Sequence, residues 1–266
     1  MSLNVDGSTA VHFVVGDPIV QVKSPAYLSQ EFQSRGFNAV VVPAHVQSRD
    51  VPRWFDGLES AKNVAGVIFT VPHKFAGFSV CTSTTPRATL LRAANVARRN
   101  GHAGWHGDML DGTGFLAALR KTGCEPRGMT ALLVGAGGAG SAIAEALMKA
   151  GLGRLRVHDE DASRIHALIE RLSSKAGTIE GCDRPDLAAC DIVINATPLG
   201  LGTGDRPPVL LDELQPRMWV ACVNTVPGCT PLIEEARQRG CATLTGNEMF
   251  EAVRDLMVEF FMETRG

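Results

Sequence analysis

A glycine-rich hexapeptide, GAGGAG over residues 135–140, constrains the fold more than any other feature of the sequence. It follows the apolar run Thr130–Val134 and leads into the small-residue stretch SAIAEAL, so we expect a strand, a tight turn and a helix. Glycines let a pyrophosphate approach free N–H groups at the start of a helix, where the helix dipole favours anions. The spacing predicts a dinucleotide site, although a structural turn or an S-adenosylmethionine loop can show the same pattern.

The residues after the next expected strand bear on which dinucleotide would bind. Asp159 comes about twenty residues beyond the glycine loop, where an acidic side chain can bind the adenosine ribose hydroxyls. Glu160 and Asp161 follow it directly, and the next arginine is Arg164. Because these acids would repel a 2′-phosphate, the sequence predicts NAD as the cofactor, with NADP disfavoured. A solvated acidic turn would have the same composition.

Strand-like and helix-like segments alternate along the chain, which predicts an α/β fold with parallel strands. We expect two α/β domains, 1–103 and 104–246, with a boundary near Asn100–Gly104. The expected strands are Ala10–Val15, Ala39–Pro43, Val67–Val71, Thr130–Val134, Leu155–His158, Asp191–Asn195, Trp219–Val223 and Ala242–Thr245. The expected helices are Ala26–Arg35, Asp50–Ala61, Thr84–Arg92, Asp111–Thr122, Ser141–Ala150, Ser163–Lys175 and Asn247–Thr264.

Composition excludes several classes of protein. The chain has 266 residues and a formal net charge of -2, so it offers no basic footprint for nucleic acid. No apolar run approaches the ~18–20 residues that span a membrane, and the first residues do not resemble a signal peptide. The seven cysteines form no C-x-x-C pair or zinc spacing. We therefore expect a cytoplasmic protein with reduced thiols and no metal.

Two charged residues stand at the ends of expected elements. In VIFTVPHKF, a β-branched and aromatic run stops at a proline and is followed by His73 and Lys74. A loop lysine is ordinarily a solvated charge. In GDMLDGTG, Asp111 precedes an expected helix, where it could serve as the N-cap.

Several further segments, in this order around the glycine loop, resemble the shikimate/quinate dehydrogenase family. They are GDPIVQVKSP, FTVPHK, GDMLDGTG, NATPLG and VPGCTPLIEEARQRG. The resemblance implies an N-terminal substrate domain and a C-terminal Rossmann-type nucleotide domain with the active site in the cleft between them. It also implies that the last helix, within 247–266, folds back onto the first domain. The implied reaction passes a hydride between a nicotinamide and a secondary ring alcohol of a small cyclic hydroxy acid, without a metal.

The resemblance carries specific roles to residues of this sequence. Lys74 and Asp111 match the family's catalytic pair, and Ser24, Thr70 and Asn95 match substrate-binding positions. The lysine could accept the hydroxyl proton if its pKa were lowered, or it could only orient the hydroxyl; both readings stay open. The implied cofactor-binding residues are Gly135, Ala136, Gly137, Gly138, Ala139, Asp159, Thr197, Val223 and Gly246.

The departures from the family concentrate on the substrate. Val22, Ile68, Thr225 and Val253 stand where the family usually has serine, asparagine, tyrosine and glutamine. A hydrogen bond to a charged group is worth about 1.5–3 kcal/mol, so these losses predict an altered or weakly bound substrate. A catalytically impaired NAD-binding sensor or regulatory protein is the alternative, which the retained Lys74 and Asp111 argue against. No membrane partner is expected, and a monomer and a homodimer both fit.

Overall fold

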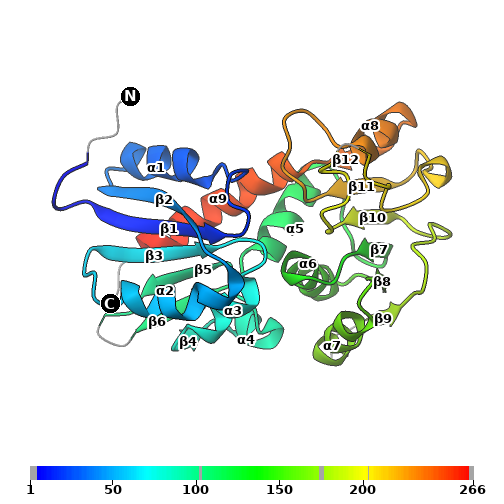
Figure 1. The fold of residues 1–266 in the computed structure, drawn as a ribbon. Coiled ribbons are helices and arrows are strands. Elements are labelled where there is room, and N and C mark those ends of the chain that lie inside the picture. Colours follow the sequence, from blue (N-terminus) through cyan, green and yellow to red (C-terminus); the bar gives the residue numbers. More distant parts are fainter. Residues whose placement is uncertain (1–4, 102–103, 174–176, 203, 264–266) are drawn as a thin grey trace. The chain divides into compact units, whose positions relative to one another are not determined.

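The computed structural model describes residues 5–101, 104–173, 177–202 and 204–263. They form two compact units, one of Met1–Leu110 with Arg254–Gly266 and one of Asp111–Val253. Each unit is a sheet with flanking helices, which confirms the predicted α/β fold with two domains (Figure 1). The functional domain limits expected at residues 103 and 246 stay predictions.

The first unit contains a mixed sheet with the strand order β2-β1-β3-β5-β6-β4. Its strands are β1 (Ala10–Gly16), β2 (Ala39–His45), β3 (Val64–Phe69), β4 (Ser83–Thr84), β5 (Val96–Arg99) and β6 (Trp105–Asp108). Its helices are α1 (Ser24–Ser34), α2 (Val51–Leu58), α3 (Lys74–Ser79) and α4 (Pro86–Leu91), with a short 3-10 turn at Ser48–Asp50. The strands β2, β1 and β3 are parallel, whereas β5 runs antiparallel to both β3 and β6.

Aromatic residues on neighbouring positions of β1 anchor helices to both faces of this sheet. Successive strand side chains point to opposite faces, and His12 and Phe13 illustrate this. The His12 ring lies 5.0 Å from the ring of Phe32 in α1 and 4.7 Å from that of Phe261. Phe261 belongs to α9 (Gly246–Met262), whose last part lies in the first unit, as predicted for the final helix. Phe13 meets Trp54 of α2 edge to face at 5.5 Å on the other side.

The second unit contains a parallel sheet with the strand order β12-β11-β10-β7-β8-β9 (Figure 1). Its strands are β7 (Thr130–Val134), β8 (Arg154–His158), β9 (Thr178–Gly181), β10 (Ile192–Asn195), β11 (Trp219–Cys222) and β12 (Ala242–Leu244). Its helices are α5 (Asp111–Lys121), α6 (Gly138–Lys149), α7 (Ala162–Leu172) and α8 (Pro231–Gln238), with a 3-10 turn at Leu211–Glu213. The order reverses direction between β7 and β10, and dinucleotides bind at the carboxyl ends of the strands beside such a switch point.

Short elements account for most differences from the sequence-based expectations. The strands β4, β5, β6 and β9 were not predicted, because runs of two to four residues are too short to show a period. The expected boundary near Asn100–Gly104 lies in the connection of the antiparallel pair β5 and β6, where Arg99 faces Trp105. His102 and Ala103 in that boundary lie outside the described residues, as do Lys175 and Thr264 at the ends of two expected helices.

The strand before the lysine motif starts and ends earlier in the sequence than predicted. β3 starts at Val64 and ends at Phe69, two residues before the expected end at Val71. Lys74 then opens the short helix α3, although the sequence was interpreted as a loop at this point. Within the described parts of the chain, no helix is both long and apolar enough to cross a membrane.

Burial of His12 predicts an acid-sensitive fold. Desolvation lowers the pKa of His12 from 6.5 to about 4. Because the folded-state pKa is the lower one, the unfolded chain binds the proton more tightly, and stability falls as pH drops from 6.5 toward 4. We expect His12 to contribute about 2 kcal/mol of destabilisation between pH 7 and pH 5. Urea unfolding at both pH values measures this difference.

The variant His12→Phe supplies the control, because it keeps an aromatic ring that cannot be protonated. Its loss of stability between the two pH values should be smaller than that of the wild type by this same amount. Equal losses in the two proteins would contradict the assignment to His12.

Candidate active site

The predicted substrate-domain residues gather at one edge of the first sheet. Ser24 opens α1 after the carboxyl end of β1, and Thr70 and Lys74 follow the carboxyl end of β3. Asn95 directly precedes β5, which starts at this edge because it runs antiparallel to β3. The backbone N–H of Phe69 donates to the Asn95 carbonyl over 2.8 Å. Ligands of open α/β sheets bind at the carboxyl ends of the parallel strands, so this edge is the candidate substrate site.

Hydrogen bonds on both sides of Lys74 fix its backbone. His73 is buried, and its Nε2 lies 2.7 Å from the Val46 carbonyl oxygen. The Ala94 N–H donates to the Lys74 carbonyl over 2.9 Å. These bonds tie the start of α3 to the end of β2 and to the segment before β5. The backbone around the lysine is therefore held by the segment after β2 and the segment before β5, and the catalytic role of Lys74 stays a prediction.

Asn95 holds the turn that leads to Asp111. Its side chain is buried, and its Oδ1 accepts a hydrogen bond from the Leu110 N–H over 2.9 Å. Asp111 is the first residue of α5 and is itself only 6% exposed. The position at the first turn fits the N-terminal preference for an acidic side chain, because the helix dipole favours a negative charge there. Asn95 thus makes a structural hydrogen bond through Oδ1, and its contact with a substrate stays a prediction.

A buried carboxylate next to this turn was missed by the sequence analysis. Asp108 accepts hydrogen bonds from Arg87 Nε over 2.7 Å, from Arg87 Nη2 over 2.5 Å and from Thr85 Oγ1 over 2.5 Å. Burial alone would raise the pKa of Asp108, but the bonds from Arg87 and Thr85 and the charge of Arg87 hold it below its usual value. GDMLDGTG shows two acids, yet nothing in the sequence indicates that Arg87 pairs with the first.

Removing Arg87 should destabilise the protein by leaving this carboxylate unpaired. Asp108 has a 5% exposed side chain, whereas that of Arg87 is 30% exposed. Breaking a fully buried pair costs about 3–5 kcal/mol, and partial exposure reduces this to roughly 2–4 kcal/mol for Arg87→Ala. Denaturant unfolding at pH 7 measures the loss. Arg49→Ala, which removes an exposed ion pair with Asp50, is the matched control and should change stability by less than about 0.5 kcal/mol; similar losses in both would contradict the assignment.

The glycine loop of the second unit joins β7 to α6 as predicted from the sequence. Gly135 has a φ of +104°, and a Cβ there would lie 2.9 Å from the Ala196 carbonyl carbon, so no other residue fits without strain. Gly137 is different, because a Cβ at this position would meet no described atom within 4 Å. Open space above Gly137 fits a site that a pyrophosphate approaches closely.

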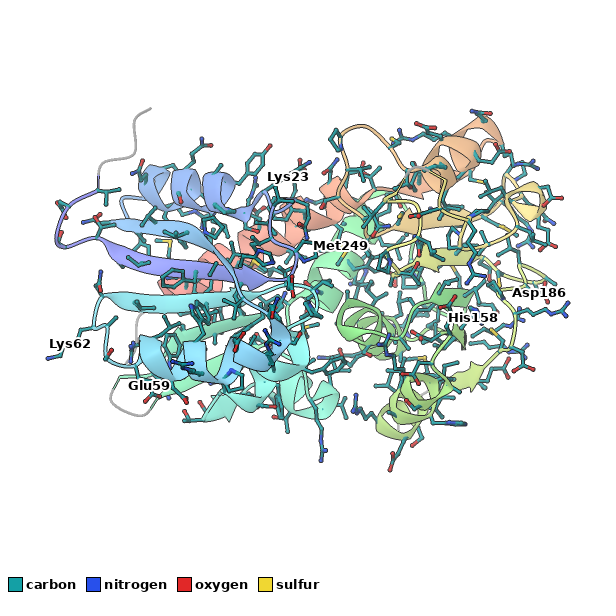
Figure 2. All side chains as sticks on the ribbon, viewed as in Figure 1. Lys23, Glu59, Lys62, His158, Asp186 and Met249 are labelled. Carbon is teal, nitrogen blue, oxygen red and sulfur yellow. The ribbon has the colours of Figure 1, made fainter. Side chains whose placement is uncertain are left out.

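Asp159 binds the glycine loop itself. Its Oδ2 accepts a hydrogen bond from the Ala136 N–H over 2.7 Å, and its Oδ1 accepts from the Asp161 N–H over 2.9 Å. His158, which precedes it at the end of β8, lies 3.0 Å through Nδ1 from the Cys182 carbonyl (Figure 2). The acid therefore stabilises the turn on which the predicted ribose contact depends, and that contact stays a prediction.

The remaining predicted cofactor residues follow the carboxyl ends of β10, β11 and β12. Thr197 Oγ1 donates to Asn195 Oδ1 over 2.7 Å, and the Val223 N–H donates to the Asn195 carbonyl over 3.0 Å. Gly246 opens α9 shortly after β12. Asn195, buried at the end of β10, therefore orders two of the predicted contacts. The motif NATPLG contained this residue, but its spacing alone did not reveal the structural role.

An added methyl group at Gly137 should weaken nucleotide binding without changing the stability of the fold. We expect Gly137→Ala to leave the melting temperature unchanged and to weaken dinucleotide binding about tenfold or more, because the methyl fills the space that a phosphate needs. Fluorescence titration with NADP+ measures the affinity. Gly57→Ala in α2 is the control, because its added Cβ also meets no described atom within 4 Å. Unchanged affinity in Gly137→Ala would contradict the predicted role of the loop.

The positions that depart from the family pattern are apolar or partly covered. Ile68 is 3% exposed in β3, and Val253 is 4% exposed in α9. A Cβ at Gly114 of α5 would lie 2.3 Å from Val253 Cγ2, so this valine packs closely against α5. Val22 and Thr225 are partly buried. These side chains fill space where the family pattern has polar groups.

The acidic turn after β8 carries arginines as well as acids. Arg164 lies 3.5 Å through Nε from Asp161 Oδ2 and 3.8 Å through Nη1 from Asp159 Oδ1. Arg206 Nη2 forms an ion pair with Glu160 across 46 positions of the sequence. The sequence analysis missed Arg206, since only the fold places it at this turn.

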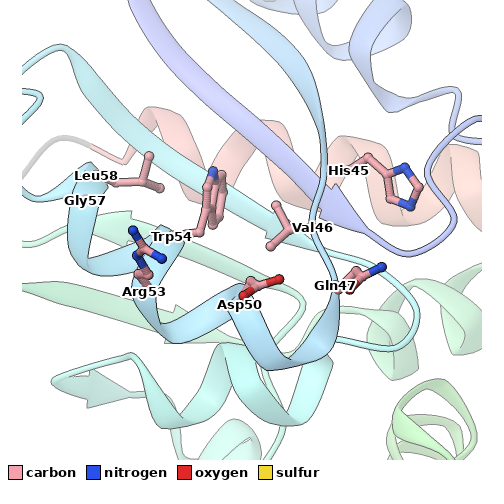
Figure 3. Close-up of a pocket in the computed structure, with 8 residues that line it drawn as sticks. All are labelled: His45, Val46, Gln47, Asp50, Arg53, Trp54, Gly57 and Leu58. Atoms are coloured by element: carbon pink, nitrogen blue, oxygen red, sulfur yellow. The ribbon is translucent and has the colours of Figure 1, made fainter.

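A pocket of the first unit is lined by none of the predicted site residues (Figure 3). It is lined by His45, Val46, Gln47, Asp50, Arg53, Trp54, Gly57 and Leu58. In the described ranges, no cluster of three or more His, Cys, Asp or Glu side chains could hold a metal ion. Neither observation indicates a second catalytic centre.

Residues 14–97 match the family model for the shikimate dehydrogenase substrate binding domain. A shikimate dehydrogenase (NADP(+)) of Rubrobacter xylanophilus is 34% identical over 92% of this chain and 88% of its own length. A relative of the same name in Anaeromyxobacter sp. is 32% identical over 92% of this chain and 88% of its own. The crystal structure of shikimate dehydrogenase from Aquifex aeolicus superposes with a TM-score of 0.90 at 22% identity, covering 99% and 96% of the two chains.

The names of these relatives contradict the predicted preference for NAD. Both curated relatives are named for NADP(+), so the acidic turn at residues 159–161 did not identify the cofactor. The physical reason lies in the partners of these acids. The prediction treated Glu160 and Asp161 as uncompensated charges, whereas Arg206 and Arg164 pair with them.

Proposed function

The chain belongs to the shikimate dehydrogenase family, and we propose that it transfers a hydride between NADP(H) and a secondary ring alcohol of shikimate or a related cyclic hydroxy acid. The observation that carries this proposal is the 34% identity to an enzyme named shikimate dehydrogenase (NADP(+)) along 92% of the chain. The glycine loop, with open space beside Gly137, supports the proposal that a nucleotide binds at the carboxyl ends of the strands of the second sheet.

The reaction needs a group that handles the hydroxyl proton. When the alcohol is oxidised, its carbon gives up a hydride, for which a nicotinamide supplies the acceptor, and its oxygen gives up a proton. We assign Lys74 and Asp111 to this step. The lysine either accepts the proton or orients the hydroxyl, and the carboxylate hydrogen-bonds the same hydroxyl or positions the ammonium.

The polar groups that the candidate site lacks bear on which substrate it binds. Ser24, Thr70 and Asn95 remain as polar candidates at the edge of the first sheet, whereas Val22 and Ile68 replace polar residues of the family pattern. Since each lost charged hydrogen bond weakens binding by about 1.5–3 kcal/mol, we propose weak affinity for shikimate itself and a better substrate with fewer polar groups or a different placement.

The alternative of a catalytically impaired sensor is not favoured, because the similar curated proteins are named as enzymes. We further propose that the enzyme is cytoplasmic and acts as a monomer or homodimer. All seven cysteines have free thiols, which supports a reducing compartment. Size-exclusion chromatography with light scattering would determine the oligomeric state.

Substitution of Lys74 and Asp111 tests the catalytic assignment. We expect Lys74→Ala and Asp111→Ala each to lower kcat with NADP+ by about 10²–10⁴-fold, because each removes a group that handles the proton. The assay crosses NADP+ with shikimate, quinate and aminated analogues and follows NADPH absorbance.

Lys62→Ala provides the matched control. This exposed lysine precedes β3 in the same unit (Figure 2), and its loss should leave kcat within about twofold. Unfolding curves establish that the variants remain folded. Full activity in Lys74→Ala would refute its role, and absence of turnover by the wild type across the whole panel would refute the proposed function.

A further inference from the structure

We propose that Arg206 determines the preference for NADP. Its guanidinium binds the adenosine 2′-phosphate at the turn after β8, where Arg206 pairs with Glu160 in the structure. This inference rests on the proposed use of NADP. It assigns phosphate recognition to a loop that follows β10, outside the turn after β8 that ordinarily reads the adenosine ribose.

The location of Arg206 carries the first part of the argument. In this fold the residue just after the end of the second strand adjoins the adenosine ribose, and here that residue is Asp159, directly after β8. Glu160 comes next in the chain and pairs with Arg206 Nη2. The guanidinium is therefore held one residue from the carboxylate that marks the ribose, although Arg206 lies 46 positions beyond its partner.

Hydrogen bonds within the loop order the described residues just before Arg206. The Asp205 Oδ2 accepts hydrogen bonds from the Gly200 N–H over 3.1 Å and from the Gly202 N–H over 2.8 Å. Two prolines, Pro207 and Pro208, follow and restrict the backbone on the other side. The side chain of Arg206 as a whole is 68% exposed, so a ligand can reach its guanidinium.

Charge explains why this arginine would matter for the choice of cofactor. A phosphate monoester carries a charge of about −1.5 to −2 near pH 7, and the acids at residues 159–161 would repel it. Arg164 lies against two of these acids, and Arg206 pairs with the third. A guanidinium binds phosphate through two parallel hydrogen bonds, so a 2′-phosphate can compete with the single carboxylate of Glu160 for Arg206. NAD has only a hydroxyl there and gains nothing from this exchange.

The test compares ligands that differ only in the 2′-phosphate. Affinities of the full-length protein for NADP+ and NAD+, and for 2′,5′-ADP and 5′-AMP, are measured by calorimetric titration. We expect Arg206→Ala to weaken NADP+ and 2′,5′-ADP binding about tenfold or more and to change NAD+ and 5′-AMP binding by less than about twofold. Glu160→Gln should strengthen NADP+ binding severalfold, because it removes the competing carboxylate.

The control is Arg154→Ala. Arg154 also forms an exposed ion pair with a glutamate, Glu180. It stands at the amino end of β8, whereas the proposed nucleotide site lies at the carboxyl ends of the strands. Its loss should leave all four affinities unchanged. Equal losses for NADP+ and NAD+ in Arg206→Ala, no loss for either, or a wild type that binds 2′,5′-ADP no better than 5′-AMP would overturn the inference.

These binding measurements do not require turnover, which separates the two proposals. If the wild type failed to oxidise every cyclic hydroxy acid but lost its 2′-phosphate preference in Arg206→Ala, the proposed function would fail and the role of Arg206 would stand. If turnover with NADP+ were normal in Arg206→Ala with an unchanged KM for the cofactor, the proposed function would stand and the role of Arg206 would fail.

Discussion

Parallel pairing of strands is the constraint on which the candidate site depends. It places the carboxyl ends of neighbouring strands at one edge, so residues far apart in sequence come together. In the second unit this edge collects the glycine loop, Asp159, Thr197 and Val223 from four strands. In the first unit the antiparallel strand β5 joins the same arrangement, because it starts where β3 ends and so brings Asn95 to Thr70 and Lys74.

The sequence allowed the large features to be predicted because each had a local cause. A glycine loop between an apolar strand and a small-residue helix specifies its own turn, and the longer parallel strands are apolar enough to recognise. The strands β4, β5 and β6 have no such signal, since their stability comes from pairing with strands elsewhere in the chain. Lys74 was interpreted as a loop residue although it opens the helix α3, because a helix of six residues is too short to show a period in the sequence.

Electrostatic partners were the least predictable part of the site. Asp108 and Glu160 are both acids in recognisable motifs, but their arginines lie 21 and 46 positions away. A count of neighbouring charges in the sequence treats such acids as uncompensated, and this error led to the wrong prediction of NAD as the cofactor. The fold converts Asp108 into the buried half of an ion pair and gives Glu160 an exposed partner. Charge arguments from sequence therefore hold only where the partner is local.

The side-chain amide of Asn195 makes the loop after β10 sensitive to the exchange of a single atom. Its Nδ2 donates to the Leu199 carbonyl over 3.0 Å, while its Oδ1 accepts from the N–H and hydroxyl of Thr197. Deamidation, a slow hydrolysis that ages proteins in storage, would exchange that nitrogen for oxygen and so set two acceptors against each other. The exchange would alter a single heavy atom and would loosen the loop beside β10 without changing any residue of the glycine motif. Burial of Asn195 keeps water from this amide and so protects the loop from that change.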